Sequence, residues 1–188
     1  VLNLLRWVSP RTIKETFEAP VEWRERILAA LDQNHLVLYN QRIVSMKGGR
    51  DAHEVLLRLR EGDQLTPPMA FIPAAERYGL MTSLDRWVVT TLLDRLKADA
   101  STERWHINLC AATAKDEGFP DFLAGRLQET GVDPGRLVFE MPETDVVTHP
   151  AEIGGFAALL DAAGCGFAID DFGSGLASFV ALKYLRGH

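Results

Sequence analysis

The chain has 188 residues, of which 47% are hydrophobic and 24% are charged, and its formal net charge is −6. This composition is that of an ordinary globular protein with a sizeable core. The acidic balance disfavours non-specific binding to nucleic acid polymers or anionic membranes, and no apolar run approaches the ~18 residues that a membrane span needs.

The two cysteines and the chain ends give expectations about compartment and extent. Cys110 and Cys165 lie in apolar segments without metal-ligand spacing, which is typical of reduced core cysteines in a cytoplasmic protein. The chain begins with Val1, shows no signal peptide, and ends in LKYLRGH without a terminating element. We therefore expect a linker from a preceding segment over residues 1–20 and a C-terminally incomplete domain over residues 21–188.

The first half of the chain mixes helical and strand-like patterns. Trp23, Ile27 and Leu31 recur at helical spacing, which predicts a helix from residue 21. Strands are expected over residues 35–44 and 53–60, with a turn rich in Gly and Lys between them. A helix that Gly79 can end follows, and a second helix, opened by a Thr or Ser cap, is expected over residues 82–98.

From about residue 100 the pattern becomes a regular alternation. Strands are expected over residues 105–110, 136–141 and 166–171, and helices over residues 120–131 and 150–164, with another helix beginning in SGLASFVALKYL. Such alternation with short connections predicts a parallel sheet with helices packed outside it. About five strands cannot close a barrel of eight, so the alternative to part of a barrel is an open sheet. The spacing of the elements alone does not decide between these two folds.

Oxygen-bearing side chains recur near the ends of these strands. Asn108, Glu140 and Asp170 lie near the C-terminal ends of three consecutive predicted strands, and Glu54 starts an earlier one. That end of the sheet is where TIM barrels and open α/β sheets place their active sites. Carboxylate and amide oxygens suit a hard cation such as Mg²⁺ or Mn²⁺.

The adjacent pair Asp170 and Asp171 poses an electrostatic question. Two neighbouring carboxylates repel each other unless cations lie between them, and two metals ~3.5–4 Å apart are a known arrangement for hydrolysing phosphate esters. Simpler alternatives exist for each residue: Asp171 could cap a following helix, Asn108 could bond a neighbouring strand, and Glu140 could pair with an Arg. It is less plausible that all three alternatives hold at once, because buried acids at strand ends need partners.

Longer segments match the motifs of one family in order from about Val21 to the last residue. LVLYNQRIV is similar to LxLYYQPIV, EVLLR to EALLR, and FIPAAERYGLMTSLDRWVV to FIPxAExxGLIxxLxxWVL. INLC corresponds to VNLS, FEMPET to FEITET, and IDDFGSGLASFVALKYL to LDDFGTGYSSLSYLKRL. The chain therefore resembles the EAL domain family, the bacterial phosphodiesterases that act on cyclic di-GMP.

The resemblance implies an α/β fold and a set of site residues. The fold would be a modified TIM (β/α)8 barrel with an antiparallel first strand, of which this chain covers roughly the first five strands. The implied ligands of one Mg²⁺ or Mn²⁺ are Glu54, Asn108, Glu140 and Asp170, with Asp170 and Asp171 holding a second ion. The implied dinucleotide contacts are Gln41, Leu56 and Arg58, with Arg58 on a phosphate, and Glu143 would stabilise the DDFGSG loop.

The implied activity is hydrolysis of one phosphodiester bond of cyclic di-GMP to linear pGpG by metal-activated water, with Glu54, Asp170 and Asp171 as catalytic residues. The implied assembly is a homodimer, with other signalling domains in the same polypeptide. The chain departs from the family pattern at Val55 and Arg42 and in the DDFGSG loop, and the family's catalytic Lys would fall beyond His188. Alternatives are a weakly active or inactive cyclic di-GMP receptor, and a domain that mainly carries a dimer interface.

Overall fold

The computed structural model describes residues 20–45 and 51–173. Two compact units are found in the chain: one holds the described residues up to Val37 with Arg58–Leu80, and the other holds Leu38–Leu57 with those from Met81 onward. The predicted linker, apart from Pro20, and the helix predicted after Gly173 lie outside the described residues.

The first unit is built around two helices, α2 (Pro20–Asp32) and α3 (Pro68–Arg77). The apolar face of α2 buries Trp23 and Ile27, and the Trp23 ring lies 6.4 Å from the ring of Phe71 on α3. The Arg26 guanidinium stacks 3.6 Å over the Trp23 ring and pairs with Glu61 at 2.5 Å, so one cation contacts both the aromatic ring and the carboxylate. The short strand β3 (Gln64–Thr66) returns antiparallel along the end of β2.

The first two long strands, β1 (Leu36–Ile43) and β2 (Ala52–Glu61), run antiparallel to each other. Near one end the Arg60 N–H donates to the His35 carbonyl at 2.8 Å, and near the other Arg42 pairs with Asp51. Residues early in one strand therefore meet residues late in the other. The predicted antiparallel first strand is confirmed.

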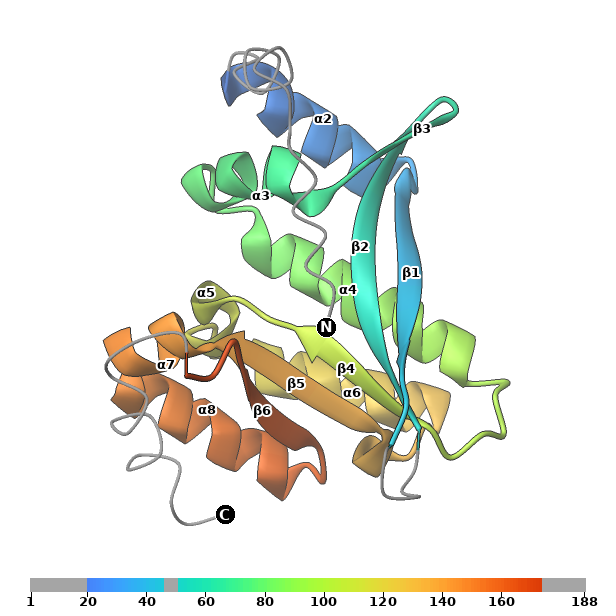
Figure 1. Cartoon of the computed structure of the whole chain (residues 1–188), viewed down its shortest axis with the longest axis vertical. Coiled ribbons are helices and arrows are strands. Elements are labelled where there is room, and N and C mark those ends of the chain that lie inside the picture. The colour runs from blue at the N-terminus through green and yellow to red at the C-terminus, as the bar shows by residue number, and fades with distance from the viewer. Residues whose placement is uncertain (1–19, 46–50, 174–188) are drawn as a thin grey trace. The chain divides into compact units, whose positions relative to one another are not determined.

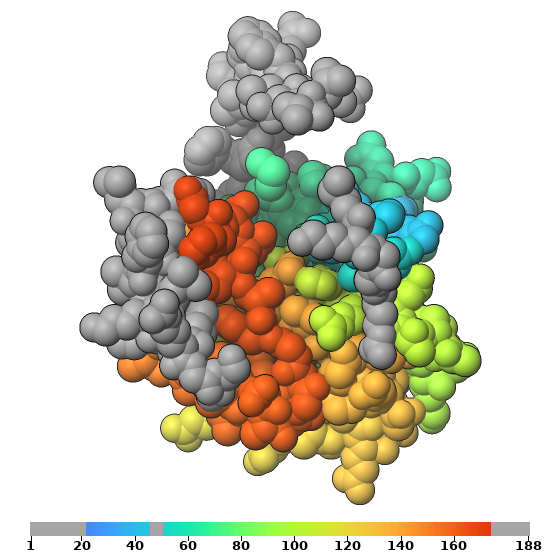
Figure 2. Space-filling model, turned by 60° about the horizontal axis from the view of Figure 1, so that its bottom comes forward, coloured from blue at the N-terminus to red at the C-terminus, as the bar shows by residue number. Residues whose placement is uncertain are grey.

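The second unit contains a parallel sheet. The strand order is β1-β2-β4-β5-β6, in which β4 (Arg104–Asn108), β5 (Leu137–Pro142) and β6 (Gly166–Asp170) all run parallel to β2. The helices α4 (Met81–Leu96), α6 (Phe119–Thr130) and α8 (Pro150–Ala162) form the connections and lie beside the strands (Figure 1). In the space-filling view, the orange-red residues of α8 and β6 lie directly beside the golden α6–β5 segment (Figure 2).

The core of this unit lies between the sheet and its helices. Val55, Ile107 and Phe139 are register partners on successive strands and are buried. Phe119 of α6 packs 6.4 Å from Phe139 and 5.8 Å from Phe156 of α8, so one ring joins three elements. Since side chains alternate between the two faces of a strand, the residues between these apolar positions point to the opposite face.

Several short elements were not predicted. They are α5 (Ala111–Ala114), the 3₁₀ helix η1 (Pro134–Arg136) and α7 (Glu143–Thr148).

Among the described residues, no helix combines the length and the apolar character needed to cross a membrane.

Candidate functional site

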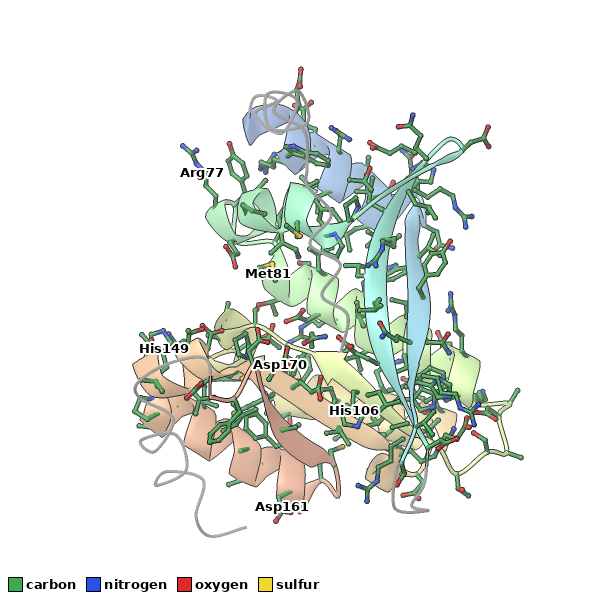
Figure 3. All side chains as sticks on the ribbon, in the orientation of Figure 1. Arg77, Met81, His106, His149, Asp161 and Asp170 are labelled. Atoms are coloured by element: carbon green, nitrogen blue, oxygen red, sulfur yellow. The ribbon has the colours of Figure 1, made fainter. Side chains whose placement is uncertain are left out.

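The face of the parallel sheet opposite the helices carries a row of polar side chains. Register pairs Glu54 of β2 with His106 of β4, and Asn108 of β4 with Glu140 of β5. Asp170 closes β6, opposite Pro142. His106 and Asp170 can be followed in Figure 3. Four adjacent strands therefore each contribute at least one predicted ligand to one sheet face.

Glu54 and Asn108 lie in direct contact. The Asn108 side-chain Nδ2 donates a hydrogen bond to Glu54 Oε1 at 3.1 Å, joining β2 to β4. The alternative that Asn108 bonds a neighbouring strand is therefore correct as a contact. It does not compete with a role in ion binding, because a side-chain amide has a donor and an acceptor on different atoms.

Glu140 has a partner that the sequence pattern did not predict. Its Oε1 lies 2.5 Å from Nδ1 of His106, and the side chains are only 16% and 21% exposed. The expected alternative partner was an Arg. A histidine takes that place because alternation puts His106 on the same face as Asn108, next to Glu140.

The chain leaves the strand at the Asp170–Asp171 pair. Strand β6 ends at Asp170, one residue earlier than predicted, and Asp171 adopts a left-handed conformation with φ of 53°. The Asp171 N–H donates to Asp170 Oδ1 at 2.8 Å. The left-handed residue ends the strand alternation, so the two carboxylates are no longer forced to opposite faces.

The described part of the chain does not bring three or more His, Cys, Asp or Glu side chains close enough together to hold a metal ion. The predicted ligands are instead arranged as pairs, Glu54 with Asn108 and Glu140 with His106, with Asp170 and Asp171 at the end of β6. Glu54, Asn108, Glu140 and Asp170 carry side-chain oxygens on one face of the sheet, and their role as metal ligands stays a prediction.

Glu143 lies at the start of α7, directly after β5. It is 3% exposed, and its Oε2 accepts a hydrogen bond from the Gly173 N–H at 3.0 Å. Within the described residues its second oxygen, Oε1, has no hydrogen-bond partner. The contact ties the start of α7 to the turn that follows Asp170 and Asp171.

The predicted dinucleotide contacts lie on the first two strands. Gln41 is exposed on β1, while Leu56 and Arg58 are half-buried on β2, two and four residues after Glu54. Leu56 belongs to the second compact unit, and Arg58 begins the β2 portion of the first.

A buried carboxylate, Asp85 of α4, supports the connection after Asn108. It accepts hydrogen bonds from Thr113 Oγ1 at 2.5 Å and from the Cys110 N–H at 3.2 Å. Burial raises the pKa of Asp85, although these hydrogen bonds oppose the shift. Burial also raises the pKa of the Cys110 thiol to about 11. The signal for Asp85 was present in the sequence: an acid directly beside Leu84 and three residues before Val88, on the apolar side of a helix.

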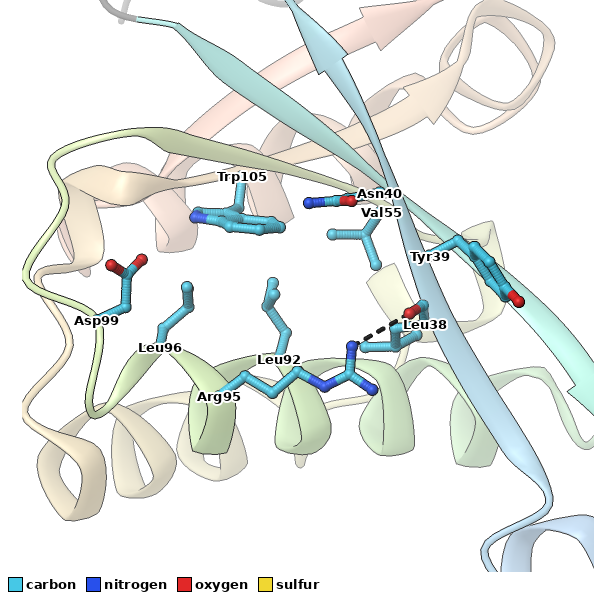
Figure 4. A pocket seen from close by; sticks show the side chains of 9 residues that line it. All are labelled: Leu38, Tyr39, Asn40, Val55, Leu92, Arg95, Leu96, Asp99 and Trp105. Carbon is cyan, nitrogen blue, oxygen red and sulfur yellow. Dashed lines mark hydrogen bonds between the residues drawn. The ribbon is translucent and has the colours of Figure 1, made fainter.

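A cavity of about 270 Å³ is lined by β1, β2, β4 and α4, with the Trp105 indole above Leu92 and Leu96 (Figure 4). Arg95 donates to the Leu38 carbonyl at 3.1 Å at its edge. Its lining contains none of the predicted ligands, so this cavity on the helix side of the sheet is not the candidate site.

Comparisons with known proteins agree with the motif matches. A family model described as the EAL domain matches residues 24–187. The cyclic di-GMP phosphodiesterase PdeF of Escherichia coli (strain K12) is 34% identical over 167 residues, covering 87% of this chain and 22% of PdeF. The chain spans about a fifth of the length of the curated relatives it matches.

Two solved structures show the same fold. The FimX EAL domain from Pseudomonas aeruginosa bound to c-di-GMP has a TM-score of 0.83 and 30% identity, covering 87% of this chain and 68% of that one. The Xanthomonas citri FimX EAL domain in complex with c-di-GMP has a TM-score of 0.82 and 27% identity, covering 94% and 69%.

Proposed function

Because this chain belongs to the EAL domain family, we propose that it is part of a phosphodiesterase that hydrolyses cyclic di-GMP to linear pGpG. The observation that carries the proposal is the row of oxygen donors on adjacent parallel strands, with Glu54 and Asn108 already in contact. The relatives named as cyclic di-GMP phosphodiesterases and the EAL domains bound to c-di-GMP supply the substrate class.

The donor set fits Mg²⁺ or Mn²⁺. Glu54, Asn108, Glu140 and Asp170 offer only oxygen atoms as ligands, the preference of hard cations, and Asp171 with Asp170 would hold a second ion. When bound, such ions lower the pKa of water and neutralise charge that develops on the phosphate. Glu54 and Asn108, in contact before binding, need little rearrangement to act together.

The remaining site residues orient the substrate. Arg58 presents a planar guanidinium, which can bind two phosphate oxygens at once, while Gln41 and Leu56 contact the nucleotide. The water oxygen attacks phosphorus, the bond from phosphorus to the ribose 3′-oxygen breaks, and that oxygen takes a proton. Glu143 keeps the turn after Asp170 in place through Gly173.

We also propose the wider setting that the family implies. The chain would act in the cytoplasm, form a homodimer, and be joined to other signalling domains in its polypeptide. The much greater length of the curated relatives supports the last point.

A second candidate is a cyclic di-GMP receptor without turnover. The observation that favours it is the arrangement of the described acids in pairs, with Glu140 engaged by His106 instead of gathered with two other acidic or histidine side chains. A receptor would need the nucleotide contacts and could dispense with the full ligand set.

Incubation of cyclic di-GMP with the polypeptide that contains these residues separates the two candidates. We expect pGpG by chromatography only when Mg²⁺ or Mn²⁺ is added, and a loss of at least about 100-fold in rate for Glu54→Gln, which has nearly the same shape but lacks the charge. A folded protein that forms no product with either metal contradicts the phosphodiesterase. If it still binds cyclic di-GMP by calorimetry, it is the receptor.

A further inference from the structure

The contact between His106 and Glu140 has no part in the phosphodiesterase mechanism proposed above. We propose that His106 is a positioning residue that orients the Glu140 carboxylate toward the divalent ion, an inference that rests on the proposed function. Of the predicted ligands, Glu140 is the one that the described structure holds by an imidazole at 2.5 Å.

The geometry of the sheet makes this contact a diagonal one. The backbone register sets Asn108 opposite Glu140 and sets Val138 opposite His106. The Glu140 side chain therefore contacts a residue of β4 that lies two positions before its register partner. The register partner itself, Asn108, is its other neighbour on the same face. Fixing Oε1 in this way fixes the rotamer of the side chain and thereby the direction of its second oxygen, Oε2.

The chemistry of the pair defines which atom donates. The form of Glu140 that binds a metal ion is the carboxylate, which can only accept, so in that form Nδ1 of His106 donates the hydrogen bond. Carboxylates that bind metals are themselves held by hydrogen bonds from neighbouring groups, and removing such a group typically weakens metal binding about 10–100-fold. A carboxylate already held in one rotamer loses less conformational freedom when it binds.

The position of His106 favours this role over simple space filling. In the register of β2 and β4 it stands opposite Glu54, so the imidazole lies between strands that carry two of the predicted ligands. Its side chain is 21% exposed, whereas the apolar residues Ile107 and Leu109 that flank Asn108 on this strand segment are 1% and 4% exposed. His106 is on the polar face, outside the packed core.

Titration of Mn²⁺ into the full polypeptide by calorimetry tests the proposal. We expect His106→Ala to bind Mn²⁺ about 10–100-fold more weakly than the parent, and His106→Asn to recover most of that loss, because its side-chain nitrogen can occupy the place of Nδ1. The KM for cyclic di-GMP at saturating Mn²⁺ should not change. His35→Ala, which removes an exposed histidine of the first unit, serves as the matched control.

Each outcome of the Mn²⁺ titration either supports or contradicts the positioning role of His106. If folded His106→Ala binds Mn²⁺ as tightly as the parent or more tightly, or if His106→Asn is no better than His106→Ala, the positioning role is wrong. A parent that binds no Mn²⁺ overturns both this inference and the proposed function. A parent that binds Mn²⁺ with the predicted variant pattern, yet hydrolyses nothing, supports the inference and contradicts the phosphodiesterase.

Discussion

At the residue scale, three of the four acids predicted to bind metal already have a donor beside them. Glu54 accepts from Asn108, Glu140 lies against His106, and Asp170 accepts from the Asp171 N–H. Such partners offset the cost of placing carboxylates on a partly desolvated face. The pairs explain how like charges can share one sheet face before a cation binds.

Glu143 gives a prediction at this scale. Glu143→Ala removes the acceptor of the Gly173 N–H, so amide hydrogen exchange at Gly173 should become faster, while Glu143→Gln keeps an acceptor oxygen and should retain most of the protection. NMR-detected exchange measures both. Equal protection at Gly173 in the alanine variant and the parent would show that this hydrogen bond does not hold the turn.

At the element scale, long segments were predicted well and short ones were not. The five predicted strands all exist, with ends shifted by one or two residues, because their apolar patterns extend over several residues. The elements β3, α5 and α7 were missed because three to six residues are too short to show a period. They depend instead on tertiary partners, as β3 depends on pairing with β2.

Two glycines, one within α6 and one at its C-terminal cap, should respond oppositely to alanine. Gly131 caps the helix with φ of 68°, which strains any side chain, whereas Gly125 lies within the helix, and a Cβ at either position would meet no atom within 4 Å. We expect Gly131→Ala to lower the free energy of unfolding by about 1 kcal/mol and Gly125→Ala to raise it by about 0.5–1 kcal/mol. Urea denaturation measures both, and a stabilising Gly131→Ala would contradict the left-handed cap.

Asp85 connects α4 to the segment after Asn108 and makes stability depend on pH. Its pKa is raised in the folded state, because burial favours the protonated form. Asp85 therefore contributes fully to the free energy of unfolding below its ordinary pKa of about 3.9. This contribution is lost as the pH rises through the folded-state pKa. Asp85→Asn cannot titrate. The free energy of unfolding of the parent should therefore fall relative to that of Asp85→Asn as the pH rises above about 4.

Denaturant unfolding at a series of pH values measures this difference. Asp63→Asn, at an exposed carboxyl in the turn before β3, controls for the general effect of removing a negative charge. The difference in the free energy of unfolding between the parent and Asp85→Asn is then corrected with this control. If the corrected difference stays constant with pH, burial does not raise the pKa of Asp85 in the folded state.

At the scale of the whole molecule, the sheet separates two tasks. Val55, Ile107 and Phe139 face the helices and form the core, while the intervening positions carry the candidate ligands. One alternation of side chains therefore serves both folding and function. The residue types and their shared face were predictable from the sequence on this basis.

The contacts within the site were less predictable. Alternation places His106 beside the predicted ligands, but its bond to Glu140 depends on the register of β4 and β5 and on two side-chain rotamers, which no sequence pattern specifies. The left-handed turn at Asp171 likewise depends on the structure that follows β6. The sequence pattern therefore does not specify how the strands pair or which rotamers the side chains adopt.

Hydrolysis of cyclic di-GMP in H₂¹⁸O, with the full polypeptide and Mn²⁺, tests the central claim most directly. Attack of water on phosphorus, with cleavage of the bond to the 3′-oxygen, should place one ¹⁸O in the terminal phosphate of pGpG, as detected by mass spectrometry. A folded, Mn²⁺-supplied protein that leaves cyclic di-GMP intact would contradict the proposed hydrolysis, as would a label on the ribose instead of the phosphate.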